Sequence, residues 1–282
     1  MRRRRHVLAR DWLPASGAFR HLGCPNSPKA PRRRSGLARR GRRPEAGTHS
    51  PAHPPAVSGV FVTGTGTEVG KTVVAAAIAR TAAASGRRVA VFKPAVSGLD
   101  EGGEPDHALL RRAAGSSQPD EEIAPYRYGP AVSPHLAAEL AGETIDPRRL
   151  RAGAGAAAAA GDTLIVEGVG GFLVPLTLGS IGSRAAGYLI RDLARDLALP
   201  IVIAASAGLG TINHTLLTVE AVRAAGLEVA AVVLTPWPDE PGELERSNRE
   251  TIAGLGEVRV DALPSLHLDE PASWPALEVD GL

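Results

Sequence analysis

A glycine-rich segment at residues 64–72 constrains the fold of this chain more than any other feature. Its sequence is Gly-Thr-Gly-Thr-Glu-Val-Gly-Lys-Thr, and it lies between an apolar run and an alanine-rich run. Glycines permit backbone conformations that turn several N–H groups inward, and the helix that follows adds the positive end of its dipole. We therefore expect a phosphate-binding loop in which Lys71 contacts the β- and γ-phosphates of ATP and the Thr72 hydroxyl binds Mg²⁺.

The sequence after residue 57 alternates short apolar runs with helical patterns. Near-continuous runs of Val, Ile and Ala are typical of parallel strands that helices cover on both faces. The pattern therefore predicts an α/β fold with a single doubly wound, mostly parallel sheet of the P-loop NTPase type. The predicted strands are residues 58–63, 88–93, 163–166, 201–205 and 228–234. The predicted helices are residues 71–85, 106–114, 134–141, 147–160, 185–197, 213–225 and 245–255.

Residues 1–56 differ in composition from the rest of the chain. They contain thirteen Arg and one Lys against Asp11 and Glu45, a net charge of +12, whereas the remainder carries −10. This segment is rich in Pro, Ser and Gly and lacks an apolar period, so we predict a disordered extension, or sequence upstream of the true start. A nucleic-acid-binding arm and an organellar targeting peptide are the alternatives. The domain that carries the phosphate loop is then residues 57–282.

Composition also argues against several partners and sites. No apolar run reaches the roughly 20 residues of a membrane span, so we expect no membrane partner. The acidic body argues against a nucleic-acid partner. The single cysteine, Cys24, fits a reducing compartment and a cytoplasmic protein. His107, His135, His214 and His267 lack metal-ligand spacing, and we interpret His135 and His214 as structural or capping residues.

Glu167 directly follows the strand predicted at residues 163–166 and precedes a glycine-rich turn. Ligands of open α/β sheets collect beyond the carboxyl ends of the strands. We therefore expect Glu167 to hold Mg²⁺ beside the phosphates, as an Asp does in many phosphate-loop enzymes. The alternative is a helix cap or an exposed turn acid.

Two further charged residues follow predicted strands or turns. Lys93 ends the second predicted strand, where a lysine could stabilise charge on a transferring phosphoryl group. Taken alone, it would more often be a solvated lysine at a strand end. Asp106 begins a predicted helix, and on local grounds an N-cap is more common there than a metal ligand.

Several segments together resemble one family. The loop is unusual, because the first glycine of the standard motif would fall on Thr65 and Gly64 stands one residue further out. From about residue 60 to residue 266 the chain is similar to the dethiobiotin synthetases, and residues 237–239 and 247–249 look like the actinobacterial branch. The segments that carry the resemblance are Val-Thr-Gly-Thr-Gly-Thr-Glu-Val-Gly-Lys-Thr at 62–72, Lys-Pro-Ala-Val-Ser-Gly at 93–98, Ser-Pro-His at 133–135, Val-Glu-Gly-Val-Gly-Gly at 166–171 and Gly-Leu-Gly-Thr-Ile-Asn-His at 208–214.

The resemblance implies a reaction in biotin biosynthesis. ATP, Mg²⁺, CO₂ and 7,8-diaminononanoate are the expected reactants. One amine of the substrate forms a carbamate with CO₂, and the carbamate attacks the γ-phosphate to give a carbamic-phosphoric anhydride. The second amine then closes the ureido ring and expels phosphate. The resemblance thus implies an ATP-dependent cyclo-ligase in which the protein supplies positioning and positive charge.

The same resemblance implies roles for individual residues. Lys71 and Lys93 would stabilise the carbamate and the transferring phosphoryl group, and Thr67 and Glu68 would shape the phosphate site. Ser97 would contact the diamine side. The implied Mg²⁺ ligands are Thr72, Asp106 and Glu167. The implied nucleotide contacts are Glu68, Val69, Gly70, Lys71, Thr72, Val73, Asp106, Glu167, Gly168, Val169, Gly170, Thr235, Pro236, Pro264, Ser265 and Leu266.

The family works as a homodimer with the substrate pocket at the interface. The helix start at Gly210, Thr211 and Ile212 would receive the substrate carboxylate from the neighbouring subunit. Thr235-Pro236 stands where many members have Asn-Asp for reading the base, and proline lacks an N–H donor. The resemblance therefore leaves other nucleoside triphosphates open as co-substrates. Val169 replaces the usual Ala, which is a small change.

Two other classes use similar loops. Glutamine-dependent amidases of cobalamin precursors carry an added glutaminase domain with a nucleophilic cysteine, and no such cysteine follows Leu266. Partition-type ATPase switches place a second lysine early in the loop, where Thr65 stands here. Both features favour the interpretation of the chain as similar to the dethiobiotin synthetases over these two alternatives.

Overall fold

A computed structural model describes residues 58–179, 187–280 and 282. The predictions made for residues 1–56 lie outside this part of the chain. The central sheet has the strand order β2-β3-β1-β6-β7-β8, and all of its neighbouring strands are parallel. Its strands are β1 (Ser58–Gly64), β2 (Val89–Phe92), β3 (Thr163–Glu167), β6 (Ile201–Ala205), β7 (Val229–Trp237) and β8 (Val260–Pro264).

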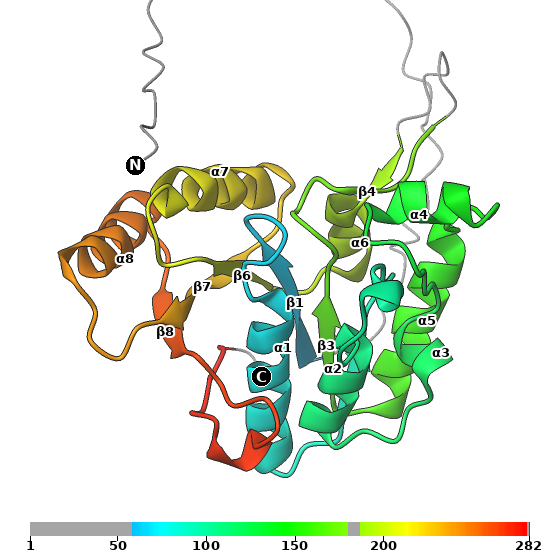
Figure 1. Cartoon of the computed structure of the whole chain (residues 1–282), viewed down its shortest axis with the longest axis horizontal. Helices are drawn as coiled ribbons and strands as arrows, with labels where there is room; N and C mark the ends of the chain where they lie inside the picture. The colour runs from blue at the N-terminus through cyan, green and yellow to red at the C-terminus, as the bar shows by residue number, and fades with distance from the viewer. Residues whose placement is uncertain (1–57, 180–186, 281) are drawn as a thin grey trace, which may run out of the picture. The chain divides into compact units, whose positions relative to one another are not determined.

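Helices cover both faces of this sheet (Figure 1). They are α1 (Lys71–Ala84), α2 (Asp106–Ala114), α3 (Asp120–Ile123), α4 (Pro134–Leu140), α5 (Pro147–Ala160), α6 (Ile190–Leu197), α7 (Thr211–Ala224) and α8 (Glu243–Gly256). Short 3₁₀ turns occur at Leu99–Glu101 and Pro271–Ser273. The doubly wound, parallel α/β fold predicted from the apolar runs is confirmed.

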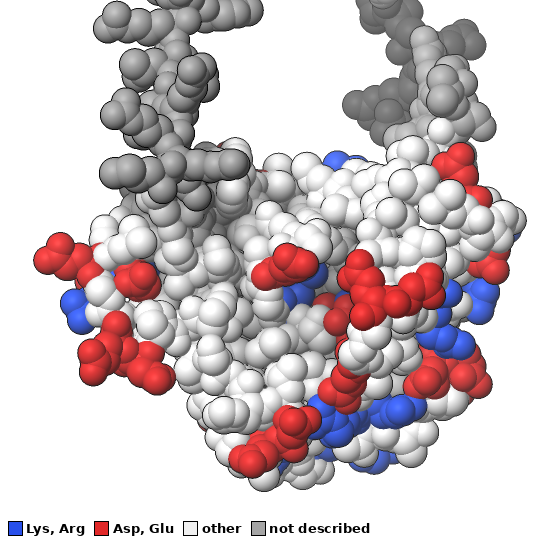
Figure 2. Space-filling view, in the orientation of Figure 1, with Lys and Arg blue, Asp and Glu red and all other residues white. Residues whose placement is uncertain are grey.

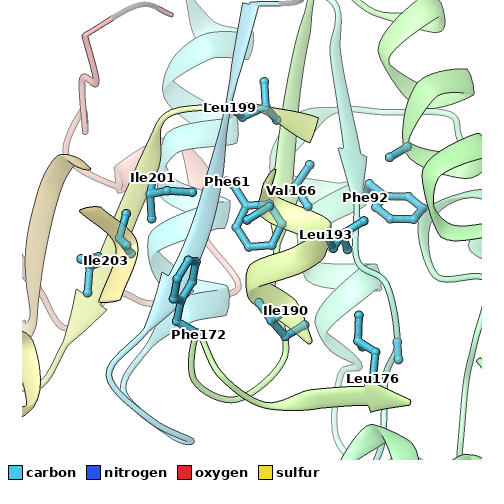
Figure 3. Packing of buried hydrophobic residues seen from close by; sticks show 14 of the residues in the cluster. Phe61, Phe92, Val166, Phe172, Leu176, Ile190, Leu193, Leu199, Ile201 and Ile203 are labelled. Carbon is cyan, nitrogen blue, oxygen red and sulfur yellow. The ribbon is translucent and has the colours of Figure 1, made fainter. Parts of the chain in front are cut away.

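The alternation of side chains along β1 divides the core in two. Phe61 belongs to one apolar cluster, whereas Val60 and Val62 belong to the other. Figure 3 shows Phe61 and Val166 packed with Ile190 and Leu193 on the first of these faces. Because both faces of the strand are buried, the strand appears in the sequence as an unbroken apolar run. The two cores hold β1 in place, so that its carboxyl end presents the glycine-rich loop.

The helix predicted at residues 185–197 is wrong at its start. Tyr188–Leu189 forms a short strand, β5, that pairs antiparallel with β4 (Pro175–Thr177). The α6 helix begins only at Ile190, where the Asp192 carboxylate accepts a hydrogen bond from the backbone N–H of Leu189 at 2.9 Å. Pairing with β4 therefore overrides the helical pattern before that cap. The sequence analysis also missed β8 and α3.

No helix within residues 58–179 and 187–280 is long and apolar enough to cross a membrane. On the face drawn in Figure 2, acidic and basic side chains are interspersed, and uncharged residues cover much of the centre.

Candidate active site

The glycine-rich loop leads from β1 into the first turn of α1. Its Thr65 N–H donates to the Ala204 carbonyl of β6 at 3.0 Å, which ties the loop to the neighbouring strand. The ammonium of Lys71 donates to the Gly66 carbonyl at 2.7 Å, so the lysine lies over the loop itself. Burial lowers the pKa of Lys71, although the charge of Glu167 acts in the opposite direction.

Close contacts set the shape of this loop. A Cβ atom built on Gly64 would lie 2.7 Å from Cγ2 of Val69 and 2.8 Å from Cγ of Lys71. A glycine at the end of β1 is therefore needed for the loop to fold back so tightly. Gly70, immediately before α1, has φ of 83°, in the left-handed region. Thr67 and Glu68 are exposed on the loop.

Four side chains from separate elements meet beside this loop. Lys93 Nζ lies 2.7 Å from Oδ2 of Asp106 and 2.7 Å from Oε1 of Glu167. The Thr72 hydroxyl lies 3.0 Å from Oδ1 of Asp106 and 2.8 Å from Oε1 of Glu167. Lys93 directly follows β2, and Asp106 is the first residue of α2. Glu167 is the last residue of β3, and Thr72 lies in the first turn of α1. We call Thr72, Lys93, Asp106 and Glu167 the charge cluster.

The burial and position of Lys93, Glu167 and Asp106 exclude the alternative interpretations drawn from local sequence. The Lys93 side chain is only 3% exposed, so it is not a solvated lysine at a strand end. Glu167 is fully buried, so it is not an exposed turn acid. Asp106 is not an N-cap, because Pro105 holds that position and makes no side-chain capping bond.

Burial and charge shift the pKa values of the cluster. Burial opposes the charge on Lys93, but the Glu167 and Asp106 carboxylates outweigh it and raise the pKa of Lys93. Burial would raise the pKa of Asp106, but the charge of Lys93 outweighs burial and lowers it. Burial raises the pKa of Glu167 despite the nearby Lys93. Burial therefore outweighs the attraction to Lys93 at Glu167, whereas the attraction outweighs burial at Asp106.

The cluster has the chemistry of a divalent cation site. Oε2 of Glu167 is buried and has no hydrogen-bond partner in the described part of the chain. A buried carboxylate oxygen is costly unless a donor or a cation reaches it. The oxygens of Thr72, Asp106 and Glu167 therefore fit Mg²⁺, which prefers oxygen ligands and keeps some from phosphates or water. Within the described ranges no three His, Cys, Asp or Glu residues gather as a metal site.

The glycine-rich turn after Glu167 lies against the phosphate loop. Gly168 N–H donates to the Val62 carbonyl of β1 at 2.8 Å. A Cβ atom on Gly171 would lie 4.0 Å from Cα of Gly66. Gly170 has φ of 62°, which favours glycine. The structure therefore brings the segment 168–171 to the loop, as expected for residues that contact the same ligand.

The other predicted site residues lie at the same edge of the sheet, and among the described residues none of them hydrogen-bonds to the charge cluster. Ser97 follows β2, in a loop that its neighbours Val96 and Gly98 anchor by N–H bonds to Tyr126 and Pro130. Thr235 and Pro236 lie near the end of β7, and Pro264 ends β8 with Ser265 and Leu266 beyond it. Gly210, Thr211 and Ile212 form the start of α7, with Gly210 left-handed at its N-cap.

Sequence analysis missed a residue that supports the start of α7. The buried Asn248 side chain of α8 donates to the carbonyls of Ala207 at 2.9 Å and Gly208 at 3.2 Å. These bonds fix the loop that precedes Gly210. The segment 247–249 was noted as a family-like motif, but nothing in its local pattern indicated which loop it would reach.

Comparison with known proteins places the chain in a family. Residues 58–269 match the family model described as an AAA domain. The chain is 46% identical over 197 residues to the ATP-dependent dethiobiotin synthetase of Anaeromyxobacter dehalogenans strain 2CP-1, covering 70% of this chain and 85% of the relative. The chain belongs to the dethiobiotin synthetase family. It is 42% identical over 202 residues to the Rhodococcus erythropolis synthetase, covering 70% of this chain and 84% of that relative.

A more distant member gives the same result. The Bacillus subtilis strain 168 synthetase is 36% identical over 203 residues, covering 72% of this chain and 84% of that protein. These relatives favour the family over the cobalamin amidases and the partition-type ATPases. The resemblance inferred from the loop and the four other segments is thereby confirmed.

Proposed function

We propose that this chain catalyses the ATP-dependent carboxylation and ring closure of 7,8-diaminononanoate with CO₂, yielding dethiobiotin, ADP and phosphate. The observation that carries the proposal is the charge cluster, where Lys93 and two carboxylates adjoin Thr72 of the phosphate loop. The relatives named above are ATP-dependent dethiobiotin synthetases, which supports ATP as co-substrate.

Two lysines of the site would assist the steps of this reaction. An amine of the substrate adds to CO₂ and releases a proton, and the resulting carbamate oxygen attacks the γ-phosphorus as ADP leaves. The second amine then attacks the carbamoyl carbon and loses a proton, and the C–O bond to phosphate breaks so that inorganic phosphate leaves. Lys71, whose ammonium lies 2.7 Å from the Gly66 carbonyl, would turn to the phosphates once they displace that contact. Lys93, buried beside the cluster, would stabilise negative charge on the carbamate and the transferring group.

Mg²⁺ would be held by Thr72, Asp106 and Glu167. When bound, it supplies positive charge that neutralises the phosphate oxygens. The uncompensated Oε2 of Glu167 supports this assignment. The same proposal places further residues around the phosphates. They are Thr67, Glu68, Val69 and Gly70 of the loop, Val73 of α1 and the segment 168–170.

The diamine would lie between two copies of the chain. Ser97 would contact its amine end, and Gly210, Thr211 and Ile212 of the partner copy would bind its carboxylate. Leu209, in the loop just before α7, is 90% exposed, and Leu217 within α7 is 56% exposed. The exposure of these apolar side chains supports a homodimer that would bury them.

The nucleotide base would lie near Thr235, Pro236 and the segment 264–266. The proposal also allows nucleoside triphosphates with bases other than adenine to bind there. The catalytic domain would be residues 57–282, acting in the cytoplasm.

The test is product formation by the purified full-length chain. With ATP, Mg²⁺, bicarbonate and 7,8-diaminononanoate, we expect phosphate release that depends on the diamine and a product with the mass of dethiobiotin. The control omits only the diamine. Phosphate release without diamine dependence, or with no cyclic urea in the mass spectrum, would reject the proposed reaction.

A further inference from the structure

Thr235 of β7 occupies the space beside the last glycine of the phosphate loop. A Cβ atom built on Gly70 would lie 2.5 Å from Cγ2 of Thr235, and 3.9 Å from its hydroxyl oxygen. The methyl group of Thr235, rather than its hydroxyl, is therefore the part that faces Gly70. Gly70 has φ of 83° and directly precedes Lys71 and Thr72.

The strand that leads to Thr235 is paired on both sides, and its register with β8 shifts between Leu234 and Trp237. The preceding residue, Leu234, pairs with Ala205 of β6 on one side and with Ala262 of β8 on the other. Thr235 itself is 3% exposed. A side chain that is buried on a strand with neighbours on both sides has little freedom to move away. The methyl group thus packs against the phosphate loop at Gly70.

We propose that Thr235 is a positioning residue for the nucleotide phosphates, acting through Gly70. Its methyl group holds Gly70 in the left-handed conformation that starts α1 and turns the loop N–H groups toward the phosphates. The affinity of the loop for a polyphosphate then depends on this methyl group, whatever base the nucleotide carries. The inference rests on the proposed use of the loop for ATP, but not on the diamine chemistry.

A matched pair of substitutions separates the methyl group from the hydroxyl. Thr235→Ser keeps the hydroxyl and removes Cγ2, whereas Thr235→Val keeps a methyl group at that position and removes the hydroxyl. Calorimetric titration of each full-length variant with ATP, CTP and inorganic tripolyphosphate measures the effect. For Thr235→Ser we expect all three ligands to bind about three- to tenfold more weakly, the effect of losing one buried methyl group. Thr235→Val should retain the wild-type affinities.

A second pair tests the contact with Gly70 directly. Gly70→Ala should weaken tripolyphosphate binding, because alanine is strained at positive φ and its Cβ meets the Thr235 methyl group. In the double variant Gly70→Ala/Thr235→Ser the Cβ has room, so binding should recover by about threefold or more over Gly70→Ala alone. Thr235→Ser would then harm the wild-type loop and help the Gly70→Ala loop, a reversal that general destabilisation does not produce.

Three results would overturn the inference. The first is wild-type affinity in Thr235→Ser. The second is a loss that appears with ATP or CTP but not with tripolyphosphate, which would assign Thr235 to the base. The third is a further loss in the double variant. A wild-type protein that binds all three ligands but forms no cyclic urea would instead contradict the proposed reaction and leave this inference standing.

Discussion

The Lys93 ammonium lies 2.7 Å from Oε1 of Glu167, and both side chains are buried. Lys93 directly follows β2 and Glu167 is the last residue of β3, and these strands are paired in register through Phe92 and Val166. Adjacent parallel strands therefore deliver the two charges to the same edge of the sheet. Thr72 from the phosphate loop contacts the same carboxylate oxygen at 2.8 Å, which joins the pair to the proposed nucleotide site.

Replacing Lys93 with alanine should separate binding from catalysis. We expect Lys93→Ala to bind ATP nearly as the wild type does and to lose about 100-fold or more in turnover, as when one stabilising donor of a transition state is removed. Calorimetry with ATP and a phosphate-release assay measure the two effects. Equal losses of binding and turnover would contradict this division of roles.

Glu167→Gln should abolish the effect of Mg²⁺ on nucleotide binding. The variant keeps the shape of the side chain but removes the charge that the proposed cation site requires. We expect Mg²⁺ to strengthen ATP binding to the wild type and to have little effect on the variant, as measured by titration with and without EDTA. Glu250→Gln, an exposed residue of α8, is the control and should behave as the wild type. An undiminished Mg²⁺ effect in Glu167→Gln would remove this residue from the site.

Asn248→Ala should loosen the loop before α7. It removes hydrogen bonds to Ala207 and Gly208 and leaves their carbonyls without that donor, at a cost of about 1–3 kcal/mol in unfolding free energy. If the start of α7 binds the substrate carboxylate, KM for the diamine should rise more than KM for ATP. Ser247→Ala, exposed on the same helix, is the control. Equal changes in both KM values would argue against a substrate role for this loop.

Tyr128 should make the fold sensitive to alkaline pH. Burial, together with the hydrogen bond to Glu143 at 3.3 Å, raises the pKa of Tyr128 above its ordinary value of 10.0. Its neutral form is favoured in the folded state, so this contribution to stability is complete below pH 10.0 and is lost as the pH rises above that value. Urea unfolding between pH 8 and 11 should show a shallower loss of stability in Tyr128→Phe. Identical slopes would contradict the assignment.

The C-terminal segment should contribute to the stability of the phosphate-loop helix. Trp274, Leu277 and Val279 are buried in the same cluster as Ile78 of α1, and the Leu277 N–H donates to the Thr81 hydroxyl at 2.9 Å. These residues lie beyond the 58–269 match to the family model. Trp274→Ala should lower the free energy of unfolding by about 3 kcal/mol or more, whereas Trp274→Phe should lose less. Chemical denaturation checks both values, and a neutral Trp274→Ala would show that this packing is dispensable.

The parts of this protein that were predictable depend on local chemistry. The strand–loop–helix order around Gly64 and Lys71 follows from glycine conformations and from the period of apolar residues, both of which act within a few positions. The helix predicted at residues 185–197 failed where a distant partner intervened, because β5 pairs with β4. The resemblance supplied Lys93 and Asp106 as site residues, although local patterns favoured a solvated lysine and a helix cap.

The amino-acid order thus specified the fold class, the phosphate loop and the family, since each is written in contiguous segments. Only the folded chain established that Lys93 is buried between two carboxylates, that Oε2 of Glu167 lacks a partner among the described residues and that Thr235 closes on Gly70. Those relationships join residues separated by 13 to more than 160 positions along the printed sequence. These contacts depend on which strands become neighbours in the sheet and on how the side chains pack there. A local sequence pattern encodes neither the strand order nor the packing.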